Sequence, residues 1–374
     1  MDFDLFVYGT VGRRHELEAG HAGLRGDLYQ RMLDELGALV HFADDNGYAG
    51  VGHPEHHLQI EGFEIANDPG LMSMWLGQHR DRLRIITCGF VSTTHNPLRV
   101  AESIATLDHM HRGRFGVGLV RGYQARWVEN FKVRPDIGAV GYWNRGGPED
   151  DANRGYFEEF VDVVVTALTN QTFSHEGEHW TFPALDRNPH EHDVYTEFGS
   201  GVDDDMTIRE VGIAPRPYQH PHPPLYSGFT GSATTAAFWG RYGGKSIVLG
   251  GPPELHRAIW DAYDETARQY GREVVPGEQA CWGGLLICAE TDAEARAQLD
   301  DMEWFWNRWS LPFGLPMPKL LVGSPDTIAA EIEAAASNVP INECMMLVPQ
   351  GIHSPAQLEA SLGLFAAEVM PRFG

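Results

Sequence analysis

Short apolar runs alternate with amphipathic segments along most of the chain. Each run has the length of a strand, and the segment after it repeats apolar residues every three or four positions, as Leu98, Ala101 and Ala105 do. That spacing is typical of a helix with one buried face. The eight expected strands cover residues 3–9, 47–52, 84–91, 115–120, 224–229, 245–250, 282–288 and 344–348.

Several of the helices that follow begin at recognisable caps, in which a small polar residue precedes proline or pairs with an acidic or amide residue three positions later. These caps are Asn96–Pro97, Thr291 with Glu294, Ser324–Pro325, and Ser354–Pro355 with Gln357. Buried strands that are each followed by a helix favour a parallel sheet, and eight of them favour a closed (β/α)8 TIM barrel. An open, doubly wound sheet is the alternative.

Three longer segments, 123–152, 184–222 and 301–319, interrupt this alternation. We interpret them as inserts in a single barrel domain that spans residues 1–374. Loops that follow the carboxyl ends of barrel strands surround the active site, so such inserts usually shape a substrate pocket. A solvated excursion or a subunit contact is the alternative. Residues 184–212 contain little that could pack as a core, and we expect them to act as a mobile lid.

The third insert also carries a cluster of aromatic residues. Trp304, Phe305, Trp306 and Trp309 could line an apolar pocket, but aromatic residues at helical spacing more often pack in a core or an interface.

Composition narrows the classes of function. The chain has 374 residues, of which 43% are hydrophobic, with no apolar stretch of membrane-spanning length and no signal peptide, so we expect a soluble, cytoplasmic protein. A formal net charge of −24 argues against nucleic acid and against anionic membrane as partners, because both bind basic surfaces. The four cysteines lack the spacing of a metal or disulfide framework and are expected to be buried thiols.

One short stretch, GVGHPEHHLQ at 50–59, gathers three histidines and a glutamate. It could be a metal site, an acid/base group or a polar loop. The spacing of His53, Glu55, His56 and His57 differs from the HExxH pattern of a zinc helix, and no partner motif is evident, so no metal site is expected. A histidine that titrates near neutrality could donate a hydrogen bond or exchange a proton.

The longest patterned region, residues 86–123, joins two strands through a capped helix and ends at Arg121–Gly122. The glycines at 116, 118 and 122 lie along or just after a strand and not at a strand-to-helix turn, so they are not a dinucleotide-binding motif. Arg121 by itself would be interpreted as a surface ion pair.

Taken together, these motifs resemble those of the bacterial luciferase-like, flavin-dependent monooxygenases. The motifs that carry the resemblance are EHH at 55–57, NPLRVAESIATLDHMHRGRFGVGLVRGY at 96–123, FSHEGEHWTF at 173–182, YSGFTGSATTAAFWGRYG at 226–243 and VGSPDTI at 322–328. The resemblance implies a (β/α)8 barrel, reduced FMN supplied by a separate flavin reductase, and dioxygen activated as a flavin C4a-peroxide. It also implies a homodimer.

The resemblance assigns roles to individual residues. His56 matches the active-site histidine near the reactive face of the flavin, while Glu55 and His57 are weaker candidates that could only orient the loop. Arg121 matches a phosphate-contacting arginine, and Cys88–Gly89 falls where the family carries a non-proline cis peptide beneath the flavin ring. The full set of expected cofactor-binding residues is Cys88, Gly89, Arg121, Gly122, Thr230, Gly231, Ser232 and Thr235.

The segment TGSATT at 230–235 also has a physical interpretation of its own. Gly231 allows close backbone approach, and Ser232 and Thr235 could present hydroxyls at a helix N-terminus, which suits an anion. An ordinary helix cap is the alternative.

We therefore expect an FMN-dependent monooxygenase that oxygenates a bulky organic substrate. The first two inserts look longer than the family requires. The resemblance is therefore a better guide to the class of reaction than to the substrate. A deazaflavin-dependent oxidoreductase on the same barrel and a non-catalytic flavin-binding subunit are the alternatives.

Overall fold

The computed structural model describes residues 1–79 and 82–374. Their contacts divide the chain into two compact units. The first comprises Met1–Gly89, Gly116–Leu119 and Pro224–Gly374, and the second comprises Phe90–Phe115 and Val120–Pro223. Organisation of residues 1–374 as a single domain stays a prediction.

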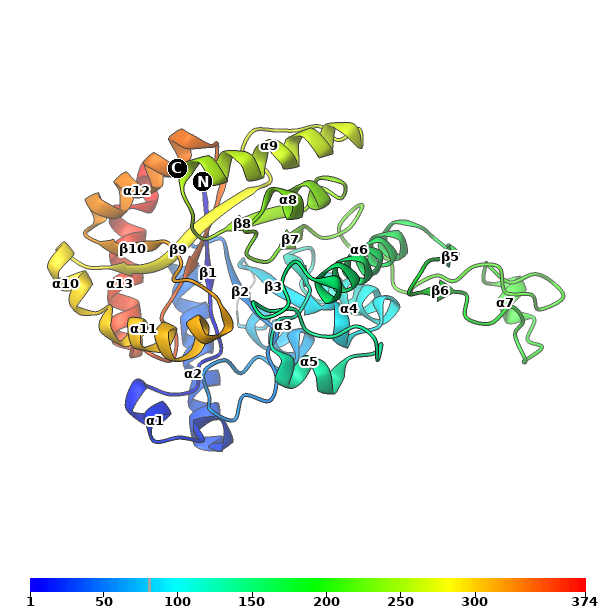
Figure 1. Ribbon diagram of the computed structural model, residues 1–374, viewed down its shortest axis with the longest axis horizontal. Coiled ribbons are helices and arrows are strands. Elements are labelled where there is room, and N and C mark those ends of the chain that lie inside the picture. Colours follow the sequence, from blue (N-terminus) through cyan, green and yellow to red (C-terminus); the bar gives the residue numbers. More distant parts are fainter. Residues whose placement is uncertain (80–81) are drawn as a thin grey trace. The chain divides into compact units, whose positions relative to one another are not determined.

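Eight parallel strands close into a barrel in the first unit, with only end residues of β3 and β4 assigned to the second (Figure 1). Their order is β11-β1-β2-β3-β4-β7-β8-β9, and pairing of β9 with β11 closes the ring. The strands are β1 (Asp2–Phe6), β2 (Gly50–His53), β3 (Arg84–Val91), β4 (Phe115–Val120), β7 (Leu225–Ser227), β8 (Lys245–Val248), β9 (Ala280–Cys288) and β11 (Glu343–Leu347). The (β/α)8 barrel and its eight strands are confirmed, and the open sheet is wrong.

Helices follow the strands of the first unit as the periodicity indicated. They are α1 (Arg14–Glu18), α2 (Gly26–Asp45), α3 (Pro69–Gly77), α8 (Ala233–Gly240), α9 (Pro253–Gln269), α10 (Asp292–Ala297), α11 (Asp300–Phe305), α12 (Pro325–Asn338) and α13 (Pro355–Glu368). Thr291 and Ser354 form the expected capping boxes, and Ser324 accepts a hydrogen bond from the Thr327 N–H. The sequence patterns missed β10 (Leu320–Gly323), which pairs with the second half of β9.

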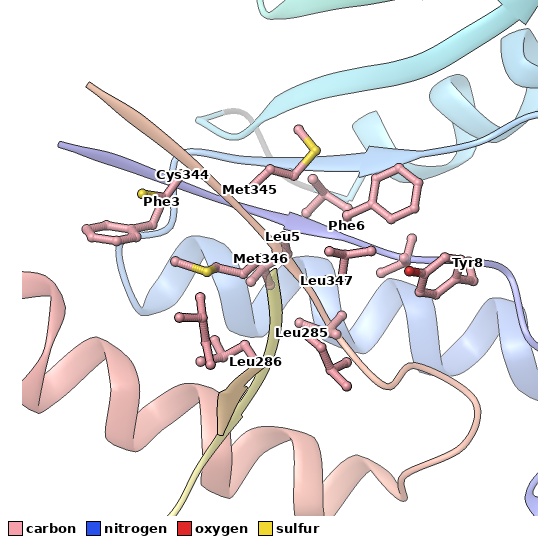
Figure 2. Packing of buried hydrophobic residues seen from close by; sticks show 14 of the residues in the cluster. Phe3, Leu5, Phe6, Tyr8, Leu285, Leu286, Cys344, Met345, Met346 and Leu347 are labelled. Carbon is pink, nitrogen blue, oxygen red and sulfur yellow. The ribbon is translucent and has the colours of Figure 1, made fainter. Parts of the chain in front are cut away.

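Apolar side chains from neighbouring strands fill the space between barrel and helices. Figure 2 shows residues of β1, β9 and β11 packed together, among them Leu5, Leu286 and Met346. Leu5 and Met346 are register partners on β1 and β11, and each of these three side chains is at most 1% exposed. The long apolar runs of the sequence are therefore strands buried on both faces, as parallel barrels require.

The second unit contains α4 (Pro97–Met110), α5 (Ala125–Phe131), α6 (Pro148–Thr169) and α7 (Val194–Glu197). The expected hairpin is present as the antiparallel pair β5 (His175–Glu176) and β6 (Thr181–Phe182). The lid role of residues 184–212 stays a prediction. Across the described residues of both units, no helix is long and apolar enough to cross a membrane.

Four ionisable side chains meet near the amino ends of the barrel strands, two buried carboxyls and two partly buried basic groups. Asp4 is fully buried, and both its oxygens lie 3.0–3.1 Å from Nη2 of Arg84. Glu343 lies 3.6 Å from the same Nη2 and forms an ion pair with Lys245. We call these residues, Asp4, Arg84, Lys245 and Glu343, the ionic layer.

The two carboxyls of the ionic layer differ in proton affinity. Burial raises the pKa of Asp4 to about 8, and the neighbouring charge of Glu343 acts in the same direction. Burial also opposes ionisation of Glu343, but Lys245 and Arg84 outweigh it and lower the pKa of that carboxyl. One ionised and one protonated carboxyl therefore share the layer near neutral pH.

This arrangement predicts a specific pH dependence of stability. Between about pH 4 and 8 the folded chain keeps a proton on Asp4 that the unfolded chain has lost, so stability falls as pH rises through that window, by up to ~1.4 kcal/mol per pH unit. Asp4→Asn should flatten this slope and stabilise the protein at pH 8–9. Urea unfolding at pH 5, 7 and 9 measures how the free energy of unfolding depends on pH. Asp2→Asn is the control, because the Asp2 side chain is 57% exposed. An unchanged slope in Asp4→Asn would contradict the prediction.

Candidate active site

The histidine-rich stretch forms the end of β2 and the loop after it, at the carboxyl end of the barrel strands. His53 is buried, with Nε2 2.9 Å from the Ser73 hydroxyl and Nδ1 3.1 Å from the Pro54 carbonyl. His57 Nε2 lies 2.8 Å from Oε1 of Glu55, whose side chain is fully buried. These contacts of the two histidines and Glu55 help to hold the loop in place, and the roles of Glu55 and His57 stay a prediction.

His56 has a different partner, Glu64, at the far side of the same loop. Its Nδ1 lies 2.9 Å from Glu64 Oε2, and the two side chains are only 10% and 4% exposed. The His56 N–H donates to the Ala66 carbonyl at 3.0 Å, so the two arms of the loop run antiparallel beside the pair.

The arm that carries Glu64 is fixed to the segment after β1. The Ile65 N–H donates to Gly9 O at 2.9 Å, and the Val11 N–H donates to Gly62 O at 3.0 Å. A side chain at Gly9 would place its Cβ 2.5 Å from Ile65 O, so this close approach requires glycine. Gln350, which follows β11, accepts from the N–H groups of Gly9 and Thr10 at 3.1 Å each.

Cys88 and Gly89 lie on β3, where the backbone comes very close to β4. A Cβ on Gly89 would lie 1.9 Å from Gly118 O, so only glycine fits. The cis peptide that the resemblance implied at Cys88–Gly89 is absent, because the cis bonds among the described residues all precede proline. Burial raises the pKa of the Cys88 thiol and so disfavours its thiolate form.

The TGSATT segment joins β7 to α8. Ser232 is the N-cap of α8, and its hydroxyl accepts from the Thr235 N–H at 3.3 Å. Thr230 is buried, and its hydroxyl donates to Ser227 at 2.7 Å. A Cβ on Gly231 would have no atom within 4 Å, so this helix N-terminus opens on space that an anion could occupy.

The aromatic cluster of the third insert packs on Phe63 and Tyr8. Phe63 stacks on Trp304 and Trp309, with ring centroids 5.7 and 5.0 Å apart, and Phe305 is fully buried. Trp306 contacts the ring of Tyr8, which follows β1. These contacts are typical of core packing, which was the preferred interpretation of this cluster.

In the second unit, Arg121 is held by residues of α6. Its Nε donates to Asn153 Oδ1 at 2.7 Å, and its Nη2 donates to Asp150 Oδ1 at 2.6 Å. Burial lowers the pKa of Arg121, although the bond to Asp150 opposes that shift. Gly122 follows with a φ of 82°.

Two partners of the predicted site residues were not found from the sequence. Glu64 lies eight positions after His56, and Asp150 lies 29 positions after Arg121; the loop after β2 and the start of α6, and not a local sequence pattern, bring each pair together. Among the described residues, no group of three or more His, Cys, Asp or Glu side chains is placed to hold a metal ion.

Comparison with known proteins identifies the family. The family model described as luciferase-like monooxygenase matches residues 1–339. The chain belongs to the luciferase-like monooxygenase family. This family consists of oxidoreductases, and the resemblance seen in the sequence motifs is confirmed.

One curated relative shows how far the sequences have diverged. The oxygenase component of a flavin-dependent trigonelline monooxygenase from Acinetobacter baylyi is 23% identical over 53% of the chain and 43% of its own length. The chain spans about half the length of the curated relatives it matches.

Solved structures share the fold over the whole chain. The monooxygenase RslO1 from Streptomyces bottropensis has a TM-score of 0.77 at 20% identity, with 100% of both chains covered. The oxygenating constituent of 3,6-diketocamphane monooxygenase from Pseudomonas putida, solved with FMN, has a TM-score of 0.73 at 18% identity, covering 100% of this chain and 98% of that one.

Proposed function

We propose that the protein is the oxygenase component of a two-component monooxygenase, which uses reduced FMN from a separate flavin reductase and dioxygen to oxygenate a bulky organic substrate. The observation that carries the proposal is the buried His56–Glu64 pair in the loop after β2. In a (β/α)8 barrel this end of the strands is where active sites lie. The FMN in the diketocamphane enzyme and the oxygenase-component relative support the same assignment. A homodimer in the cytoplasm is part of this proposal.

The chain's own residues fit a flavin phosphate at one place in the first unit. The open N-terminus of α8 offers backbone N–H groups and the Ser232 and Thr235 hydroxyls. Reduced FMN bound there would supply the electrons that activate dioxygen. Cys88 and Gly89 are proposed to lie beneath the flavin ring, and His56 would exchange a proton with oxygen near that ring.

Arg121, in the second unit, is proposed as a phosphate ligand in its own right, and this role can be tested separately. Arg121→Ala should weaken FMN binding by roughly 1.5–3 kcal/mol, the range for hydrogen bonds to a charged group. Riboflavin, which lacks the phosphate, should bind almost as before. Titration with both flavins measures the difference.

The bond from Arg121 to Asp150 requires a control for this prediction. Arg121→Ala also removes the bond from Arg121 to the Asp150 carboxylate, which keeps only the Gly146 N–H and the more distant Arg154, so Asp150→Asn should be measured in parallel to isolate that structural effect. An equal loss of affinity for FMN and riboflavin would show that Arg121 stabilises the second unit and does not bind phosphate.

The proposed function is tested by anaerobic titration of the purified protein with reduced FMN and with a reduced deazaflavin, followed by admission of oxygen. Tight binding of reduced FMN, with an oxygen-dependent absorbance change distinct from that of free FMN, is expected. Binding of deazaflavin alone would favour hydride transfer without oxygen, and binding of FMN without a reaction would indicate a non-catalytic subunit.

A further inference from the structure

We propose that Glu64 is a positioning residue that fixes which ring nitrogen of His56 carries the proton. The inference rests on the proposed function only for its consequence in the reaction, because the geometry is a property of the protein itself. The Glu64 carboxyl lies 2.9 Å from His56 Nδ1, and its side chain is 4% exposed.

The carboxyl group dictates the tautomer of the ring. The negative charge of an ionised carboxylate 2.9 Å away favours a proton on the ring nitrogen that faces it, through charge attraction. A neutral imidazole carries a single ring proton, and holding it at Nδ1 makes Nε2 the basic nitrogen. Glu64 would therefore direct proton exchange by His56 through Nε2.

The position of Glu64 is well defined because hydrogen bonds hold the residues on either side of it. Phe63 O accepts from the Thr10 hydroxyl at 2.6 Å, and the Ile65 N–H donates to Gly9 O at 2.9 Å. Gln350 in turn holds Gly9 and Thr10. Because these hydrogen bonds fix the backbone on both sides of Glu64, its carboxyl keeps one orientation and no mobile loop has to become ordered. A positioning residue requires such a fixed orientation.

The neighbouring histidine provides an internal contrast. His57 faces its own buried carboxyl, Glu55, through Nε2 at 2.8 Å, whereas His56 faces Glu64 through Nδ1. Two adjacent histidines in the same loop thus face their carboxyls through different ring nitrogens. Neutral His56 should be the Nδ1–H tautomer, and neutral His57 should be the Nε2–H tautomer.

Long-range ¹H–¹⁵N correlation spectra of the flavin-free protein test the assignment, at a pH where the histidines are neutral. His56→Gln and His57→Gln variants assign the two rings. Wild type should show opposite tautomers at the two positions. Glu64→Gln should shift His56 toward the Nε2–H form, because the amide can also donate to Nδ1, and should leave His57 unchanged.

Glu55→Gln is the matched control, since it changes a carboxyl of similar burial in the same loop that faces the other histidine. It should alter the His57 ring and leave His56 as in wild type. If Glu55→Gln and Glu64→Gln change the His56 ring alike, the carboxyls act only through loop structure and the proposal is wrong.

A second readout measures the consequence in the reaction. Glu64→Gln should raise the ratio of hydrogen peroxide to oxygenated product roughly tenfold, by analogy with the lower end of the loss seen when a partner that orients a metal-bound histidine is removed. Its affinity for reduced FMN should stay within about twofold. In a His56→Gln background the same change should have no further effect on the ratio, because both variants remove one function.

The two readouts separate the inference from the proposed function. The Nε2–H tautomer at His56 in wild type would overturn the inference whatever the activity. The expected tautomers, together with an unchanged peroxide ratio in both Glu64→Gln and His56→Gln, would overturn the role of His56 in the proposed function and limit Glu64 to fixing the ring. An equal effect of Glu64→Gln with and without His56 would overturn the link between the two residues.

Discussion

Glu343→Gln should lower the free energy of unfolding by about 3 kcal/mol near pH 6, the low end of the range for breaking a buried ion pair. The substitution leaves Lys245 and Arg84 facing each other without the one carboxyl that is ionised in the ionic layer. The loss stays at the low end because Asp4, which holds a proton in the wild type, can ionise and take over the charge.

This compensation makes the prediction more specific than a simple loss of stability. In an Asp4→Asn background no second carboxyl is left, so Glu343→Gln should cost clearly more than it does alone. Urea unfolding of the two single variants and the double variant at pH 6 measures the interaction energy. Additive effects, or a loss below about 1 kcal/mol in Glu343→Gln, would mean that the four groups do not act as one ion-paired layer.

The barrel could be predicted from the sequence because each of its signals is local. Eight apolar runs of strand length, followed by periodic segments with caps such as Thr291 and Ser354, specify strand and helix in turn, and few topologies accept that alternation. The strand β10 was missed because its four residues follow the insert and pair only with the far half of β9. Division of the chain into two units depends on contacts between distant residues, which no local pattern reports.

Candidate site residues could be named from the sequence where a motif keeps its chemistry in adjacent residues, and their roles stay predictions. EHH marked His56, and TGSATT marked a helix N-terminus whose cap the structure confirms. The partners Glu64 and Asp150 were missed because loop and helix geometry brings them to His56 and Arg121. The cis peptide expected at Cys88–Gly89 came only from the resemblance. The chain instead brings β3 and β4 together at Gly89 with no cis peptide bond there.

His56→Gln should leave the protein folded and able to bind FMN, yet strongly reduce the yield of oxygenated product for each reduced flavin consumed. Glutamine can still contact Glu64, so the buried carboxyl keeps a partner, but an amide cannot exchange a proton near neutral pH. Loss of a positioned acid or base typically costs 10²- to 10⁴-fold in a proton-transfer step. Flavin oxidation should continue and release hydrogen peroxide.

The measurement is the ratio of product to peroxide at saturating reduced FMN, with His57→Gln as the matched control. His57 lies in the same loop, is similarly shielded and also faces a buried carboxyl, so loop disturbance alone would affect both variants. A large fall in product for His56→Gln and a small one for His57→Gln would place the chemistry at His56. Equal falls would assign the effect to the loop, and an unchanged product yield in His56→Gln would remove this histidine from the reaction. An unchanged product yield would still leave Glu64 and Glu55 as the groups that hold the loop, because their contacts with the two histidine rings exist without flavin.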